Sequence, residues 1–315
     1  MRLNLVTLRL AFLTGMIMLS GGCFKPGEPE GAGMAKVPVV PVVPVVPVVP
    51  VVPVVPVVNL EIVVPTEMVE VAGGIWWVDF QGNQMKVPSI KIEDKEGKIS
   101  EYQYVKRSSE KFWMGRREVT WGEWNEVREW GKGKGYEMGK GQGEGEMYPA
   151  TGVSWYSVVK WCNAKSEKEG LTPVYVVEGA IYREGVKTPE LKAGANGYRL
   201  PTEVEWEWAA RGGEKGRGCD YSGSNDLGEV GWYEGNSLRK MHAVGEQRAN
   251  ELGIYDLSGN VWEWCFDLWV STDRVIRGGG WNSAACYARV SSRNADDGTN
   301  GHDDLGFRVT RSAIP

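Results

Sequence analysis

The sequence predicts a compact mixed α+β domain with many loops and little regular secondary structure. Glycine accounts for 42 of the 315 residues and tryptophan for 15, and both counts are well above ordinary usage. We expect turns held in place by large buried aromatic side chains instead of long regular helices. No linker or change of composition interrupts residues 60–315, so this stretch is predicted to fold as one domain.

Three helices are predicted from their start signals. Thr120 and Thr202 each precede a glutamate by three residues, which is the capping-box pattern, and Ser154 is a third N-cap residue. Glycines that follow set the ends, so the helices are expected at about 121–131, 155–168 and 203–211. Short strands are predicted at 68–71, 112–114, 174–177, 261–264, 275–277 and 307–310. The segment 131–146 is rich in Gly, Lys and Glu without an apolar period, so it is assigned to a solvent-exposed loop.

The charge balance makes nucleic acid an unexpected partner. Lys and Arg number 36 against 41 Asp and Glu, for a net charge of −5, and no basic stripe interrupts the mixture. The chain has only two histidines, His242 and His302, so a multi-histidine metal centre would need other ligands.

Residues 1–22 have the pattern of a secretory signal peptide. Arg2 and Arg9 precede or begin an apolar run over 10–19, and small residues lead to Cys23. The ending on a cysteine is typical of a bacterial lipoprotein, in which Cys23 would carry the lipid and attach the protein to a membrane. An ordinary signal peptide, in which Cys23 has no role, is the alternative. The protein is therefore expected in the cell envelope, either in the periplasm or on the surface.

A Pro-Val-Val repeat occupies much of residues 23–59. A proline at every third position from 38 to 56 cannot form a membrane-spanning helix, because each proline removes a backbone donor. The period fits a polyproline II spacer of about 70 Å that holds the domain away from the lipid. The alternative is that the repeated Pro-x-x-Pro docks into an aromatic groove.

Seven sequence blocks in a fixed order carry a resemblance to a known family. They are Glu67–Gly74, Trp113–Thr120, Val153–Tyr156, Gly197–Gly213, Gly253–Trp264, Arg277–Trp281 and Leu305–Val309. Together they resemble the formylglycine-generating enzymes, also called sulfatase-modifying factors. The resemblance implies a loop-rich domain related to the C-type lectin fold.

The resemblance also implies a calcium site. Its ligands would be Asp256, Gly259, Val261 and Glu263, two by carboxylate and two by backbone carbonyl oxygen. Calcium takes six to eight such oxygen ligands from flexible backbone. A second site of the family would begin at Asn236 and Ser237, but the loop that completes it is shortened before Val244.

The copper site of the family is incomplete in this sequence. Members that make formylglycine oxidise a substrate cysteine with dioxygen and a copper ion held by two cysteine thiolates, and soft thiolates suit copper(I). Counted forward from the glycine block, the first of those positions falls on Ser283; counted backward from Arg289 and Arg293, the second falls on Ala285, one residue before Cys286, so the loop is expected to be shortened. A serine hydroxyl cannot complete a thiolate pair, so the oxidase reaction is expected to be absent and Cys286 to be a loop cysteine.

The other cysteines leave the disulfide pattern open. The resemblance places the partner of Cys162 at Val309, so Cys162 is expected to be a buried free thiol or to pair differently. In an exported chain the four cysteines after Cys23 allow three pairings into two disulfides; they are Cys162, Cys219, Cys265 and Cys286.

These observations favour a membrane-anchored module that binds a protein or peptide. The groove that admits substrate in the enzymes would here be lined by Trp281, Asn282, Ser283, Arg289 and Arg293. An acidic run lies close in sequence; it comprises Asp296, Asp297, Asp303 and Asp304. Alternatively, the two arginines pair with that run and Trp281 belongs to the core. Two other functions stay open: a formylglycine-generating oxidase acting on a sulfatase-like cysteine, in which a shifted loop brings Cys286 to a copper, and a structural envelope protein.

Overall fold

A computed structural model describes residues 67–78, 84–85, 91–93, 99–101 and 105–312 of the chain. By internal contacts the chain divides at residues 60 and 61, and all described residues belong to the second unit. Cys23, the signal sequence and the Pro-Val-Val repeat lie outside the described residues. Within the described ranges, no helix combines the length and the apolar character that a membrane span requires.

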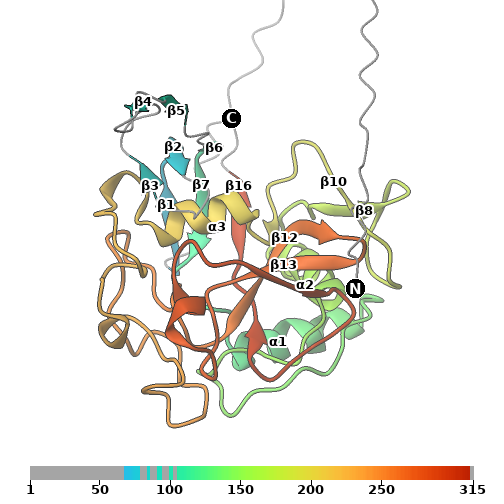
Figure 1. Cartoon of the computed structure of the whole chain (residues 1–315). Coiled ribbons are helices and arrows are strands. Elements are labelled where there is room, and N and C mark those ends of the chain that lie inside the picture. The colour runs from blue at the N-terminus through green and yellow to red at the C-terminus, as the bar shows by residue number, and fades with distance from the viewer. Residues whose placement is uncertain (1–66, 79–83, 86–90, 94–98, 102–104, 313–315) are drawn as a thin grey trace, which may run out of the picture. The chain divides into compact units, whose positions relative to one another are not determined.

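The described unit is a loop-rich α+β fold, as expected (Figure 1). Its α-helices are α1 (Trp121–Lys132), α2 (Trp155–Lys168) and α3 (Glu203–Ala210), with 3-10 turns η1 (Gly213–Lys215), η2 (Leu227–Glu229) and η3 (Ala285–Ala288). Its strands are β1 (Met68–Val71), β2 (Gly74–Val78), β3 (Gln84–Met85), β4 (Lys91–Glu93), β5 (Ile99–Glu101), β6 (Val105–Ser109), β7 (Phe112–Gly115), β8 (Tyr175–Val177), β9 (Ala180–Ile181), β10 (Glu190–Leu191), β11 (Tyr198–Arg199), β12 (Trp262–Val270), β13 (Asp273–Arg277), β14 (Asn294–Asp297), β15 (Leu305–Gly306) and β16 (Thr310–Ser312).

Both predicted capping boxes are present. Thr120 accepts a hydrogen bond from the Glu123 amide while the Glu123 carboxylate accepts one from the Thr120 amide, and Thr202 and Glu205 repeat this arrangement. Ser154 caps α2 by accepting from the Ser157 amide. These bonds satisfy amide donors that a helix leaves unpaired at its start, which explains why the helices begin where the sequence predicted.

Two four-stranded sheets organise the domain. One has the order β1-β7-β16-β11, so the first described strand and the last are joined through β7. The other has the order β14-β13-β12-β15, in which β15 runs parallel to β12. The chain passes from β15 in one sheet to β16 in the other, so residues 307–309 are not a strand and the predicted strand 307–310 was wrong in its position. The smaller sheets are β10-β8-β9, β3-β2-β6 and β4-β5.

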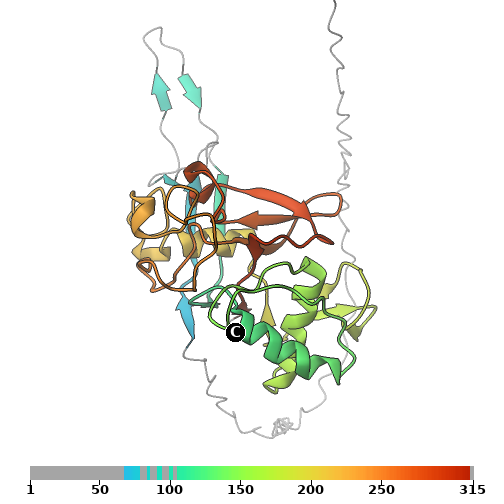
Figure 2. The same ribbon diagram turned by 90° about the horizontal axis from the view of Figure 1, so that it is seen from below.

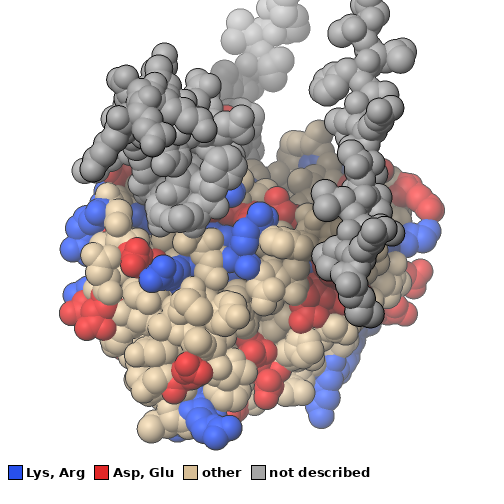
Figure 3. Space-filling view, in the orientation of Figure 1, with Lys and Arg blue, Asp and Glu red and all other residues tan. Residues whose placement is uncertain are grey.

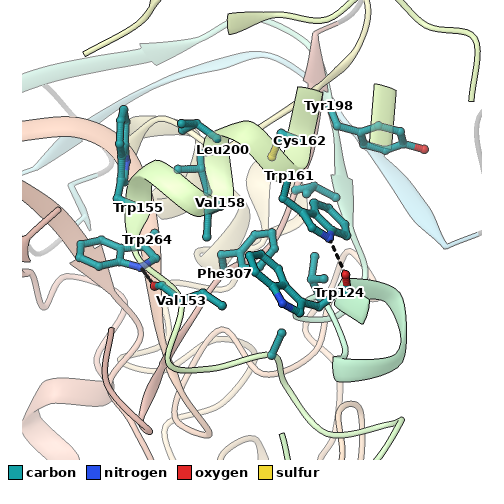
Figure 4. Close-up of a cluster of buried hydrophobic side chains, with 14 of the residues drawn as sticks. Trp124, Val153, Trp155, Val158, Trp161, Cys162, Tyr198, Leu200, Trp264 and Phe307 are labelled. Carbon is teal, nitrogen blue, oxygen red and sulfur yellow. Dashed lines mark hydrogen bonds between the residues drawn. The ribbon is translucent and has the colours of Figure 1, made fainter. Parts of the chain in front are cut away.

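Buried tryptophans form the centre of the core (Figure 4). The rings of Trp124 and Trp161 lie nearly parallel with centroids 6.1 Å apart, and Phe307 meets both of them edge-on. The indole N–H of Trp161 donates to the Trp124 carbonyl at 3.1 Å, and that of Trp264 donates to the Val153 carbonyl at 3.0 Å. Since these indole donors are satisfied, the rings can be buried without losing a hydrogen bond. Helices α1 and α2 lie side by side over this core (Figure 2).

The segment 131–146 is less exposed than the sequence predicted. Tyr136 is buried and donates through its hydroxyl to Glu167 at 2.9 Å, while the Trp124 indole donates to the Lys140 carbonyl. A single buried aromatic residue produces no apolar period in the sequence. The assignment of this segment to solvent was therefore wrong for Tyr136.

Trp124→Ala should lower the free energy of unfolding by about 3–5 kcal/mol, because it removes a fully buried ring and leaves a cavity between Trp161 and Phe307. Trp269→Ala, at an exposed position on β12, is the matched control and should change it by less than about 1 kcal/mol. Equilibrium urea unfolding of the two variants measures both values, and equal losses would contradict the described core.

Candidate functional site

The loop that follows β13 carries most of the predicted site residues. Gly278 and Gly279 have φ angles of 96° and 76°, which side chains rarely adopt. A Cβ atom on Gly279 would lie 3.0 Å from backbone atoms of Tyr287 and Ala288. The glycines therefore allow the loop to fold back onto η3.

Ser283 acts as a turn residue in this loop. Its amide donates to the Gly280 carbonyl at 2.9 Å, and its hydroxyl accepts from the Gly280 amide at 3.0 Å. Its carbonyl accepts from the Glu234 amide at 3.1 Å. The position that the resemblance assigns to a copper thiolate thus holds a hydroxyl that closes a turn.

Cys286 lies exposed on η3. All four described cysteines are free thiols, so the described part of the chain has none of the three possible disulfide pairings. Cys162 and Cys265 are completely buried, and burial raises the pKa of each thiol. A thiol with a raised pKa is a poor source of thiolate, so neither suits a metal.

Cys219 is the remaining described thiol. It is half-buried, and the carbonyl of its neighbour Asp220 accepts from the Val290 amide at 2.9 Å. The Cys219 segment therefore runs beside the end of the loop that carries Cys286.

Trp281 connects the loop to two other segments. Its amide donates to the Asn260 carbonyl at 2.6 Å, and its carbonyl accepts from the Ser237 hydroxyl at 2.7 Å. Its half-buried indole has a nitrogen that is hidden from solvent without a hydrogen-bond partner, whereas Asn282 is exposed. Trp281 is thus partly buried and partly exposed, so it is neither a pure core residue nor a fully exposed groove residue.

The two arginines of the predicted groove have partners other than the acidic run. Arg293 binds Glu203 at 2.5 Å and its guanidinium lies 4.4 Å from the Trp269 ring centroid. Arg289 is exposed and lies 3.9 Å from Asp220. The alternative in which they pair with the acidic run was therefore wrong.

Two carboxylates of the acidic run instead bind residues that are close to them in the sequence. Asp296 binds His302 at 2.9 Å and accepts from Asn300, and Asp297 accepts from Thr299. Asp303 is exposed and Asp304 half-buried.

A buried charged cluster occupies the predicted calcium position. Both carboxylate oxygens of Glu263 bind Arg308, at 2.6 and 2.7 Å, and one also accepts from the Trp206 indole at 2.7 Å. Glu263 and Arg308 are completely buried. The Glu263 side chain is therefore committed to an ion pair.

Asp256 is the carboxylate in this cluster that keeps an open position. One of its oxygens accepts from the Gly245 amide at 2.7 Å, and the other is buried without a partner. Asp256 has a φ of 58° and Gly259 a φ of 92°, so the turn between them is tightly bent.

Glu118 joins this cluster from the segment before α1. It accepts from the Asn260 side-chain amide at 2.7 Å and from the Val261 backbone amide at 3.2 Å. Burial raises the pKa of Glu118 well above its ordinary value, and the charges of Asp256 and Glu263 add to the effect. Sequence reasoning missed Glu118 and Arg308 as site residues, although both lie inside the quoted blocks.

The other predicted calcium position is not supported by its contacts. The Asn236 side chain accepts from the Tyr233 amide and donates to the Gly231 carbonyl, and the Ser237 hydroxyl holds Trp281. Across the ranges that the structure describes, no three His, Cys, Asp or Glu side chains converge as a metal-binding group.

Comparison with known proteins identifies the family. The profile of the sulfatase-modifying factor enzyme 1-like domain matches residues 61–313, so the chain belongs to the formylglycine-generating enzyme family. It is 36% identical over 266 residues to the chaperone protein LppX of Paenibacillus barcinonensis, covering 74% of this chain and 88% of that protein. It is 36% identical over 135 residues to the inactive C-alpha-formylglycine-generating enzyme 2 of Bos taurus, covering 37% of this chain and 45% of that protein.

The fold also matches a solved structure. The crystal structure of CarF aligns with a TM-score of 0.64 at 26% identity, covering 79% of this chain and 99% of that one. The predicted family and its fold are confirmed.

Asp256→Asn should remove a pH dependence of stability in EDTA. Burial raises the pKa of Asp256 from 3.8 to about 6, so the folded protein binds this proton more tightly than the unfolded chain. The resulting stabilisation is present below about pH 4 and is lost as the pH rises to about 6. We expect the free energy of unfolding of the wild type to fall by about 2–3 kcal/mol more than that of the variant over this interval, because a shift of one pKa unit corresponds to about 1.4 kcal/mol. Urea unfolding at a series of pH values measures this, and parallel curves would refute it.

Proposed function

We propose that the protein is a membrane-anchored, extracytoplasmic member of its family that binds a polypeptide partner and does not oxidise it. The observation that carries the proposal is the loop of residues 278–290, which offers one thiol where copper(I) would need two. Cys286 is the thiol, and Ser283 closes a turn in the other position. Attachment to membrane lipid through Cys23 follows from the signal pattern alone.

The names of two relatives support a binding role. One is a chaperone, and it aligns with most of this chain. The other is described as inactive within the same family, so loss of the oxidase reaction is compatible with retention of the domain.

The exposed part of the loop is the surface that we assign to partner binding. Asn282, Cys286, Tyr287 and Arg289 are exposed there, while the backbone beneath them is fixed by hydrogen bonds to other segments. A rigid surface with an exposed tyrosine and an arginine has the composition of residues that dominate protein interfaces. On the face shown in Figure 3, acidic and basic side chains are interspersed.

The purified protein should suppress the aggregation of reduced lysozyme, and the double variant Tyr287→Ala, Arg289→Ala should lose most of this effect. The exposed Leu191, on β10, supplies the control Leu191→Ala, which should behave as the wild type. Light scattering at several molar ratios provides the measurement. Absence of suppression by the wild type, or equal suppression by both variants, would contradict partner binding through this loop.

We also propose that calcium binds beside Asp256. The buried carboxylates of Glu118, Asp256 and Glu263 lie near the guanidinium of Arg308, and ionisation of all three would leave two negative charges in excess of that one positive charge. A divalent cation would neutralise this excess, and buried charges without compensation are costly. The open oxygen of Asp256 and the carbonyls of Gly259 and Val261 would supply ligands, while Glu263 would retain Arg308.

Saturating calcium should raise the melting temperature of the wild type by about 5 °C relative to EDTA, as expected for a ligand at about 100 times its dissociation constant. Asp256→Asn should melt at the same temperature in both conditions. Magnesium serves as the ion control, because its smaller ion prefers a stricter octahedral geometry. Equal calcium responses of wild type and variant would exclude Asp256 as a ligand.

A formylglycine-generating oxidase is the second candidate function. One observation favours it: a backbone hydrogen bond joins the residue after Cys219 to the end of the loop that carries Cys286. If these two thiols acted on one copper ion, copper-loaded protein would convert a cysteine peptide to formylglycine in the presence of dioxygen. Mass spectrometry of the peptide would detect the product, and Cys219→Ser and Cys286→Ser would each abolish it.

A further inference from the structure

A cavity of about 430 Å³ lies between the segment that follows α1 and the start of α2. Its wall includes the apolar or aromatic side chains of Tyr136, Met138, Tyr156 and Val186. Ser157 and Lys160 of α2 add polar groups. The volume falls within the range of small-molecule sites, which combine apolar walls with a few placed polar groups.

Lys160 is a buried cation that binds a backbone carbonyl. Only 5% of the residue is exposed, and its ammonium donates to the Gly185 carbonyl at 3.0 Å. Its remaining described contact is the ring of Tyr182, with a centroid 5.6 Å away. The charges of Glu137 and Glu184 act on this ammonium, but neither carboxylate forms a salt bridge with it among the described contacts. A buried ammonium has three donors, so two of them lack a protein oxygen here.

Ser157 offers a second donor on the same helix face. Its hydroxyl oxygen accepts from the Gly139 amide at 3.1 Å and from the Ser154 hydroxyl at 3.0 Å. With those bonds made, its own hydrogen is available to a ligand. Ser157 and Lys160 are three residues apart on α2, so their side chains lie on one face near the positive end of the helix.

Two acids limit the negative charge that the cavity can accept. Glu137 also belongs to its wall and accepts from the Gly185 amide at 3.1 Å, which fixes the loop whose carbonyl holds Lys160. Glu184 is a further nearby carboxylate, since its charge acts on Lys160 together with that of Glu137. These negative charges disfavour a dianion such as phosphate next to a single ammonium.

We propose that this cavity binds a monocarboxylate with an apolar or aromatic body. The carboxylate accepts from Lys160 and Ser157, and the body packs against Met138, Tyr156 and Val186. The carboxylate can belong to a free organic acid or to the C-terminal residue of a peptide, and the two sources share this chemistry. The site is separate from the loop of Ser283 and Cys286, so its existence does not depend on the absence of a copper site.

Ligand-observed NMR titration of the purified protein tests the site with phenylacetate as the probe for a free acid and N-acetylphenylalanine as the probe for a C-terminus. We expect one of them or both to bind with a dissociation constant on the order of 1 mM, which is typical of so small a ligand. The neutral amides of both probes should bind at least about tenfold more weakly, because they lack the charge that Lys160 recognises. Binding of only one acid would identify the source. If neither acid binds at about 10 mM, or if the amides bind equally well, the proposal fails.

Substitutions locate the binding. Lys160→Met should raise the dissociation constant of the acid at least about tenfold. Lys168→Met removes a surface ammonium from the same helix and should leave the dissociation constant unchanged. Val186→Glu adds a charge at an exposed wall position where folding is not at risk, and it should weaken binding about threefold or more. If Lys160→Met does not fold, Val186→Glu decides the matter: undiminished binding in that variant would overturn the proposal.

Discussion

The buried ion pair between Arg308 and Glu263 is the interaction on which the rest of the domain depends. It joins the segment before β16 to the start of β12, and Trp206 of α3 binds the same carboxylate. Arg308 also donates to the carbonyls of Gly115 and Tyr255, so one side chain connects four distant parts of the chain. Removal of either charge would leave the other buried without compensation, which typically costs about 3–5 kcal/mol. Such a fixed centre is needed because loops, and not long regular elements, build much of this domain.

The loop of residues 278–290 is held on that frame by backbone bonds. Gly259 donates to the Gly278 carbonyl, Trp281 donates to Asn260, and the Ser258 hydroxyl donates to the Ala288 carbonyl. A loop fixed at so many points cannot move Cys286 freely towards another thiol. The same rigidity suits recognition, because an ordered surface loses little conformational entropy when a partner binds. Loss of a copper ligand and retention of a binding surface are thus physically compatible.

Local chemistry made much of the fold predictable from the sequence. The helix starts at Thr120, Ser154 and Thr202 were correct because each depends on a hydrogen bond between residues that are close in the chain. Contacts between distant segments were not predictable in this way. The burial of Tyr136 depends on Glu167, and the division of the last predicted strand depends on two sheets that meet only in the folded domain.

The candidate site shows the same division. The sequence shows that position 283 holds a serine, because that requires only residue identity. It did not indicate that Arg308 occupies both oxygens of Glu263, or that Arg293 pairs with Glu203 instead of the acidic run. Both ion pairs join residues that lie far apart in the sequence and meet only in the folded domain.

A competitive titration with copper(I) and a chromogenic chelator tests the central claim most directly. We predict that the purified protein removes no copper(I) from the chelator and that Cys286→Ser gives the same curve. Transfer of one copper ion per chain to the wild type, abolished by Cys286→Ser, would contradict it.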